Sequence, residues 1–185
     1  MNNDWKQTLA QQGANIENGK VTNFGDLNAE LSAAVNGDIL CDLSHLALIR
    51  VSGADSSDFL QGQFSNDVRQ VDESHHQLSS YSSPKGRMLA LFRLFQRAED
   101  YYISLPQSVL ESTFKRLQMF VLMSKVSLEE VSDQLVHFGL SGPNSQQLLH
   151  EHLGSVPAEV DESLTQNEIT VLRVAGPHPR FELHG

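Results

Sequence analysis

The sequence predicts an α+β fold with largely antiparallel sheets and flanking helices. Apolar strand patterns alternate with helical patterns along the chain, without the glycine fingerprint of a dinucleotide-binding fold. A strand, a Gly-Ala-Asp or Gly-Pro-Asn turn and a helix also follow one another twice, at Gly53 and at Gly142. This faint internal repeat indicates two similar halves.

Three segments make up the predicted domain organisation. Residues 1–37 form an N-terminal helical arm with two helical patterns separated by glycines, the second carrying an apolar stripe of Leu27, Leu31, Ala34 and Val35. Residues 38–132 form a first α+β subdomain. Residues 133–185 begin a second one, and the chain stops inside what reads as a strand without its partner, which indicates a truncated chain.

The predicted elements of the first subdomain begin with two short apolar strands. Gly53 ends the second of them, and Asp55 and Asp58 lie in the first turn of the next helix, where the helix dipole favours negative charge. Gly62 closes that helix. In order, we expect strands at 38–43 and 46–52, a helix at 54–61, strands at 77–82, 87–97 and 101–105, a helix after Pro106, and a strand at 125–130.

In the middle of strand 87–97, the residues that point to either face of the sheet are apolar, which predicts a central strand covered on both faces. Arg87, Arg93 and Arg97 share one parity, and they form either ordinary solvated arginines or a row that faces an anion. The second subdomain is expected to contain a strand at 135–140, a helix at 143–153 and strands at 169–175 and 180–183.

Composition restricts the class of protein. A chain of 185 residues with 39% apolar content can build a core, and its apolar runs are far shorter than the roughly 20 residues that span a bilayer. The single cysteine, Cys41, lies in an apolar string and predicts a buried, inert thiol and a reducing, cytoplasmic location. The net charge of −10 argues against direct RNA binding through a general basic field.

A ligand site is predicted between residues 51 and 95. Amides, a hydroxyl and a carboxylate crowd the exit of the helix at 54–61, where Asn66 and Asp67 either contact a ligand or merely cap a turn. A tight turn, Pro84-Lys85-Gly86-Arg87, then leads into the apolar strand and supplies two cations. Other chemistry has little support, since the His75–His76 and His150–His152 pairs do not form chelates and read as surface histidines, and the serines at 79–83 lack a hydrolase elbow.

These blocks resemble the N-terminal part of the YgfZ family, folate-binding proteins involved in tRNA modification and iron-sulfur enzyme maintenance. The family is related to the glycine-cleavage T-protein, an aminomethyltransferase. The resemblance runs from about Asp38 to the end of the chain, and family members are much longer. The matching residues are Gly53-Ala54-Asp55, Leu60-Gln61-Gly62-Gln63, Asp67-Val68, Lys85-Gly86-Arg87-Met88, Leu94-Phe95 and Ser124-Lys125-Val126.

The resemblance implies a T-protein/YgfZ-like folate-binding domain with tetrahydrofolate or a derivative as its cofactor. Folate recognition needs a slot for the pterin, amides or carboxylates for the pterin edge and cations for the glutamate tail. The implied partners are iron-sulfur or tRNA-modifying enzymes. The candidate cofactor-binding residues are Leu46, Gln61, Gln63, Asp67, Lys85, Gly86, Arg87 and Glu182.

Two mismatches with the family keep other functions open. Where the T-protein carries an acidic pair, this chain has Ala90 and Leu91, which cannot accept a proton, so aminomethyl transfer is an alternative that these residues disfavour. The Lys-Gly-Cys loop of YgfZ proteins is missing from the sequence, and Cys41 is no substitute because it lies in a different, apolar context. A scaffold fragment that binds no ligand is the remaining alternative.

Overall fold

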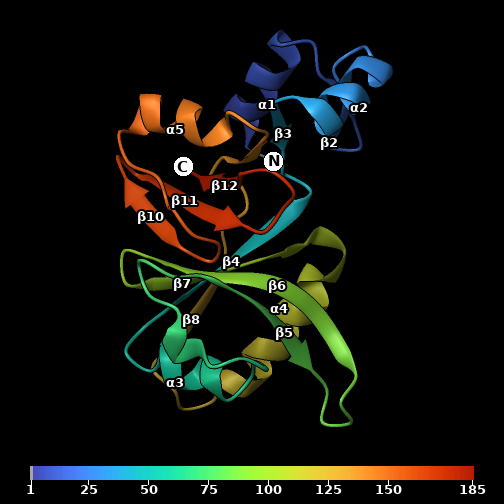
Figure 1. The fold of residues 1–185 in the computed structure, drawn as a ribbon. Helices are drawn as coiled ribbons and strands as arrows, with labels where there is room; N and C mark the ends of the chain where they lie inside the picture. The colour runs from blue at the N-terminus through green and yellow to red at the C-terminus, as the bar shows by residue number, and fades with distance from the viewer. Residues whose placement is uncertain (1) are drawn as a thin grey trace. The chain divides into compact units, whose positions relative to one another are not determined.

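The computed structural model describes residues 2–185, which divide into two compact units. Unit 1 joins the segment that ends at His45 to Asp133–Gly185, and unit 2 is Leu46–Ser132. Each unit contains one five-stranded sheet (Figure 1). All strand pairings among the described residues are antiparallel, which confirms the predicted α+β class.

Unit 1 packs helix α5 on its main sheet. The strand order is β10-β11-β12-β9-β3, and Leu149 of α5 joins a core with Val171, Phe181 and Leu183 of the sheet. Figure 1 shows α5 lying along this sheet. The elements of unit 1 are α1 (Asn3–Gln11), β1 (Asn15–Glu17), β2 (Lys20–Asn23), α2 (Leu27–Asn36), β3 (Ile39–Asp42), β9 (His137–Ser141), α5 (Ser145–Leu153), β10 (Ser163–Gln166), β11 (Ile169–Val174) and β12 (Arg180–His184).

Unit 2 contains the larger core. Its strand order is β5-β6-β7-β4-β8, and helices α3 and α4 contribute Leu60 and Leu117, both with no exposed surface, to the core beside Leu94 of the sheet. Its elements are β4 (Leu46–Ser52), α3 (Ser56–Gln61), the 3₁₀ turn η1 (Val68–Gln70), β5 (Gln77–Ser82), β6 (Met88–Arg97), β7 (Asp100–Pro106), α4 (Gln107–Val121) and β8 (Ser127–Glu130). None of the described helices of either unit is long and apolar enough to cross a membrane.

The two sheets repeat the same strand order with exchanged edge strands. In each sheet three successive strands form an antiparallel meander, β5–β7 in unit 2 and β10–β12 in unit 1. The last strand of the meander pairs with a strand that directly precedes a short helix, β4 before α3 and β9 before α5. The fifth strand is exchanged between the repeats, because β3 directly precedes β4 but pairs with β9, whereas β8 directly precedes β9 but pairs with β4. The units therefore group the chain differently from the three predicted segments, since β3 lies with residues 133–185.

The repeated glycine turns are built alike. Gly53 has φ 114° and Gly142 has φ 145°. In each turn a serine hydroxyl of the following helix donates to the glycine carbonyl, Ser56 at 2.7 Å and Ser145 at 2.8 Å. Both glycines also lie against the chain that enters the exchanged strand. A Cβ atom on Gly53 would be 2.1 Å from the Lys125 carbonyl oxygen, and one on Gly142 would be 2.3 Å from a carboxylate oxygen of Asp38.

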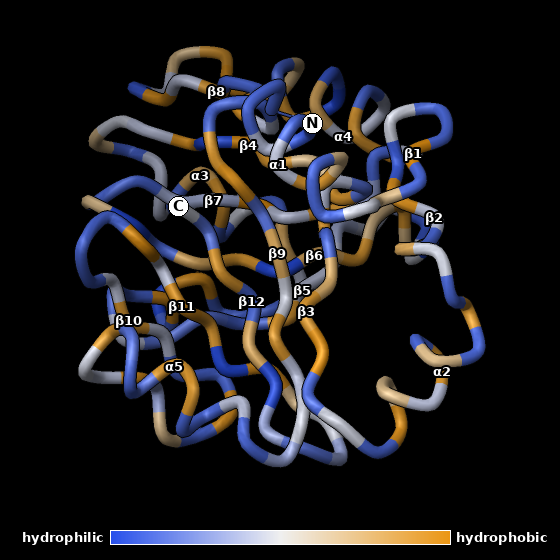
Figure 2. The backbone as a smooth tube through the Cα atoms, turned by 90° about the horizontal axis from the view of Figure 1, so that it is seen from above, coloured by the Kyte–Doolittle hydropathy of each residue, from blue (hydrophilic) through white to orange (hydrophobic). Residues whose placement is uncertain are grey.

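The N-terminal segment differs from the predicted helical arm. A two-stranded hairpin, β1 and β2, lies between its two helices. The apolar stripe of α2 is not packed, because Leu27, Leu31 and Val35 are 57%, 58% and 67% exposed and the helix has no buried residue. Figure 2 shows hydrophobic stretches on α2 accordingly.

Three further expectations are corrected by the structure. The last strand, β12, is paired on both sides, with β11 and β9, so it has no unpaired edge. Strand β6 is covered on both faces only in its second half, because Met88 and Leu91 remain 59% and 48% exposed. His76 is not a surface histidine, since it is buried beside Arg93, with 3.3 Å between His76 Nδ1 and a guanidinium nitrogen.

Candidate functional site

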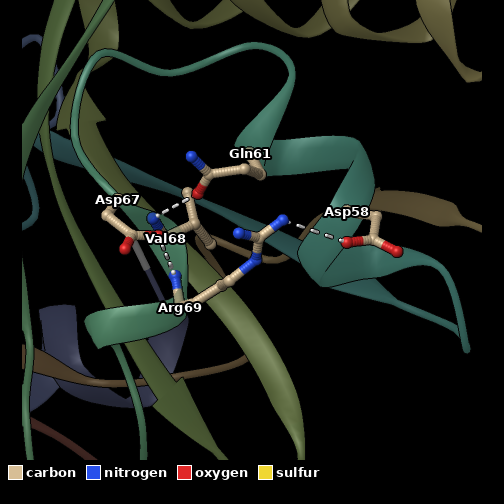
Figure 3. A network of polar contacts seen from close by, with 5 residues as sticks. All are labelled: Asp58, Gln61, Asp67, Val68 and Arg69. Atoms are coloured by element: carbon tan, nitrogen blue, oxygen red, sulfur yellow. Dashed lines mark hydrogen bonds and ion pairs between the residues drawn. The ribbon is translucent and has the colours of Figure 1, made fainter.

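The predicted amide-rich segment forms a polar corner, which we define as residues 61–67 between α3 and η1. The backbone N–H of Val68 donates to Gln61 Oε1 at 2.7 Å, and the N–H of Arg69 donates to Asp67 Oδ1 at 3.2 Å (Figure 3). Arg69 also forms an exposed ion pair with Asp58 at 3.8 Å. One oxygen each of Gln61 and Asp67 thus accepts a backbone N–H of the 3₁₀ turn, so the alternative in which Asn66 and Asp67 cap a turn describes Asp67 but not Asn66.

Two other polar side chains tie the corner to strand β5. The Ser65 hydroxyl is 2.7 Å from the Ser80 hydroxyl, and the Asn66 amide donates to the Leu78 carbonyl at 3.0 Å. Phe64 bridges to Tyr81 through the backbone. These bonds hold the corner in place, so Ser65 and Asn66 have a structural role.

Among the residues of the polar corner, Gln63 is connected to helix α4 through Tyr81. Tyr81 donates its hydroxyl to Gln63 Oε1 at 3.4 Å, and Arg116 Nε of α4 donates to the Tyr81 oxygen at 3.1 Å. The Arg116 guanidinium also stacks over the Tyr81 ring, 5.7 Å from its centroid. This chain of contacts orients the Gln63 amide and adds a cation that sequence analysis missed, because Arg116 lies in an ordinary amphipathic helix pattern.

A cleft of about 290 Å³ opens beside this chain of contacts. It approaches the lower limit of about 300 Å³ for small-molecule sites. Arg116 and Lys115 give it a positive rim, while Leu89 and Met119 supply apolar walls. Its lining residues are Tyr81, Leu89, Ser112, Thr113, Lys115, Arg116 and Met119.

The predicted cationic bend is a closed hairpin loop, which we call the basic turn, residues 83–87. The Gly86 N–H donates to the Ser83 carbonyl and the Ser83 N–H to the Arg87 carbonyl, both at 2.8 Å. Gly86 has φ 72°, a left-handed conformation that suits glycine. Lys85 and Arg87 are exposed, and with the described residues their side chains form no hydrogen bond or ion pair. The backbone is therefore fixed while both cations can receive an anion.

The basic turn and the corner are both attached to the end of β5. Tyr81, which contacts Gln63, precedes the turn by only two residues. Leu46 is half-buried at the start of β4, where it pairs with Pro106. Gln61 and Asp67 thus both accept backbone N–H groups of the η1 turn, and Gln63 is connected to the basic turn through β5. Leu46 takes no part in these contacts.

The candidate residue Glu182 belongs to unit 1. It lies half-buried on β12, opposite Gly139 of β9. With Cys41, Gly139 and Arg180 it lines a cavity of about 280 Å³. Burial raises the pKa of the Cys41 thiol above its ordinary value, although Arg180 opposes this effect. The thiol is therefore protonated at neutral pH, although Cys41 is half-buried and not fully buried as the sequence predicted.

His137, beside Glu182 on the same sheet, is a buried histidine that sequence analysis missed. Burial and, to a smaller extent, the charge of His45 lower its pKa from 6.5 to about 4, while Asp42 opposes the shift. Its imidazole is therefore neutral at pH 7. Glu182 and His184 are two residues apart on one strand and so share a face, which is the signal that could have drawn attention to this cluster.

The folded protein is expected to lose stability between pH 6.5 and about 4 because of His137. As the pH falls, the His137 imidazole of the unfolded chain is protonated near pH 6.5, whereas that of the folded protein is protonated only near pH 4. Acid therefore lowers the free energy of unfolding, by about 3 kcal/mol once the pH is below both pKa values. Urea denaturation at several pH values, with EDTA present, measures the effect. The variant His137→Gln should lack this component, and identical pH profiles for both proteins would contradict the assignment.

The fold defines an α+β domain of the aminomethyltransferase type. It is similar to glycine cleavage system aminomethyltransferase T from Bartonella henselae, with a TM-score of 0.82 over 100% of this chain and 53% of that chain. A heterotetrameric sarcosine oxidase from Corynebacterium sp. U-96 is a more distant neighbour, with a TM-score of 0.56. The identities are 16% and 10%, so both comparisons show the fold alone.

The sequence itself places the chain in a family. The GCVT N-terminal domain model matches residues 8–176, and the chain belongs to this family. Relatives named tRNA-modifying protein YgfZ are 26% identical in Colwellia psychrerythraea, 32% in Enterobacter sp. strain 638 and 30% in Escherichia coli O7:K1. These alignments include 77–78% of this chain and 43–44% of each relative, so the chain spans less than half the relatives' length. The resemblance to YgfZ proteins is confirmed.

Proposed function

We propose that this domain binds tetrahydrofolate or a derivative, and that the protein supports tRNA modification and iron-sulfur cluster assembly or repair in the cytoplasm. The observation that carries the folate proposal is the basic turn, where two exposed cations without partners among the described residues follow a strand that contacts the amide of Gln63. A folate offers a carboxylate tail to such cations and a hydrogen-bonding heterocycle to such an amide. The relatives named tRNA-modifying protein YgfZ motivate the cellular role.

In this proposal, each candidate residue of unit 2 has a separate task. Lys85 and Arg87 bind the glutamate tail, and Gly86 lets the turn adopt its left-handed backbone. Gln61, Gln63 and Asp67 supply polar groups and Leu46 an apolar wall, whereas the candidate Glu182 belongs to unit 1 and is given no role in this unit 2 site. Iron-sulfur or tRNA-modifying enzymes are the proposed partners, and the net charge of −10 disfavours direct RNA binding by this segment.

Removing both cations of the basic turn should weaken folate binding. The double variant Lys85→Ala/Arg87→Ala is expected to lose about 1–3 kcal/mol of binding free energy for folate with its glutamate tail, since charge-assisted contacts are lost. Isothermal titration calorimetry measures the change. A pterin without the tail should bind both proteins equally.

The chain offers a matched control for this experiment. Arg69 and Lys125 are also exposed cations of unit 2, but both lie outside the basic turn and outside the cleft beside Tyr81, and Arg69 is paired with Asp58. The variant Arg69→Ala/Lys125→Ala changes the net charge by the same amount and should bind folate like the wild type. Equal losses in both double variants would mean that only the overall charge matters, and unchanged affinity in the first would remove the basic turn from the site.

The aminomethyltransferase alternative has less support from this chain. Ala90 is 4% exposed in the core of unit 2, so the position offers neither a carboxylate nor access to solvent. Without a carboxylate there, this position cannot accept a proton from a substrate amine. An assay for folate-dependent formaldehyde release tests this alternative, and no folate binding at all would favour the scaffold alternative.

A further inference from the structure

Three side chains that commonly bind metal ions lie together on one face of the unit 1 sheet. His137 on β9 and His184 on β12 are directly opposed in the antiparallel register. Glu182 precedes His184 by two residues, and alternation along a strand places it on the same face. One donor atom from each of the three lies within 4.8 Å of the other two.

The two histidines are buried in close contact. His137 is 6% exposed and His184 has no exposed surface, and their ring centroids are 4.0 Å apart. With the described residues, Nε2 of His137 forms no hydrogen bond. A buried polar atom without a partner destabilises the fold, and coordination to an ion would remove that cost.

A cavity also lies beside these donors. Gly139 stands opposite Glu182, and because it has no side chain the Cys41 sulfur packs close to it, 3.0 Å from where a Cβ atom would lie. The cavity of about 280 Å³ lined by Gly139 and Glu182 borders the same face. An ion held by the three donors could therefore keep a further coordination position for water or a ligand from the cavity.

We propose that His137, Glu182 and His184 bind a divalent transition-metal ion, for which zinc fits best. Two imidazoles with one carboxylate suit zinc, whereas magnesium and calcium prefer oxygen donors alone. Tetrahedral coordination at about 2.0–2.1 Å puts donors roughly 3.4 Å apart, so side-chain rotation must bring them closer by at most about 1.4 Å. The exposed Arg180 on the same strand face opposes a cation, and this limits the affinity.

Zinc titration of chelator-treated protein tests the proposal. Calorimetry is expected to show one zinc ion per chain, and His137→Ala and Glu182→Gln should each weaken binding by more than about 100-fold, because loss of an outer partner alone costs about 10–100-fold. His150 and His152 of α5 are exposed histidines of the same unit, so His150→Ala and His152→Ala serve as controls and should bind zinc like the wild type. Cobalt, added instead of zinc, reports the ligand set through its visible spectrum.

Circular dichroism of each variant separates loss of the site from loss of the fold. Glu182 is half-buried, and glutamine has the same size and shape as glutamate, so Glu182→Gln is expected to fold. If a histidine variant unfolds, the zinc affinity of Glu182→Gln decides whether the site exists. The proposal is overturned if the wild type shows no saturable zinc binding, or if His150→Ala abolishes binding that Glu182→Gln leaves intact. Folate titration of His137→Ala is a separate readout, since the proposed folate site consists of residues of unit 2 and the proposed zinc site of residues of unit 1.

Discussion

Replacing Gly53 with alanine is expected to lower the free energy of unfolding by about 4 kcal/mol, the sum of backbone strain and overpacking. Gly53 has φ 114°, which L-residues rarely adopt, and a Cβ atom would lie 2.1 Å from the Lys125 carbonyl oxygen. To relieve the clash, the chain must move Lys125 away, which strains the bond from the Lys125 N–H to Asp55 Oδ2, now 2.7 Å long. Urea denaturation followed by circular dichroism measures the loss.

Gly86→Ala is the matched control in the same unit. Gly86 also has a positive φ, 72°, but a Cβ atom there meets nothing within 4 Å among the described residues. Only the conformational cost remains, so we expect a loss of about 1 kcal/mol. Equal losses at Gly53 and Gly86 would show that the close approach of Lys125 contributes nothing.

Replacing Phe92 with alanine is expected to cost about 3–5 kcal/mol of stability. Phe92 is 2% exposed in the core of unit 2, and its ring centroid is 4.4 Å from that of Phe64. Phe64 is part of the polar corner, so the cavity should also loosen the residues on either side of it. Chemical denaturation measures the stability, and the exchange rates of the amide hydrogens of Gln63 and Ser65 report the corner.

Leu91→Ala is the control for this core variant, since Leu91 neighbours Phe92 on β6 but is 48% exposed. Its loss should stay below about 1 kcal/mol, as for other partly exposed apolar residues. A small loss in Phe92→Ala, comparable with that in Leu91→Ala, would contradict the packing described for this core.

Strands with strong apolar patterns could be predicted from the sequence. The bounds of β4 (Leu46–Ser52) and β5 (Gln77–Ser82) agree with the prediction, because glycine and polar residues mark their ends. Strands β1, β2 and β10 were missed, since they are three or four residues long and mostly polar. Such strands form because a partner lies next to them in space, which local patterns do not reveal.

The exchanged edge strands could not be predicted for the same reason. Pairing of β3 with β9 joins segments separated by the whole of unit 2, and no local pattern at Ile39 specifies a partner at Ser141. The faint glycine repeat indicated two similar halves but carried no information on which sheet each edge strand joins.

Site residues were predictable only in part. The identity of the polar corner and the basic turn could be predicted, because each is a continuous stretch of chain. The contacts that orient Gln63 come from Tyr81 and from Arg116 of α4, and these depend on how α4 packs. The His137–His184 pair depends on strand register, which becomes known only once the order of the sheet is known.

Exchanged edge strands also bear on the order of events during vectorial synthesis at the ribosome. Unit 2 is continuous in sequence and can be complete once Ser132 has emerged, whereas β3 must wait for β9. About 100 residues separate the two strands, so β3 remains without its neighbour for roughly 5–20 s at common elongation rates. During that interval the nascent chain exposes a strand edge to other chains, and a chaperone that shields this edge would raise the yield of native protein.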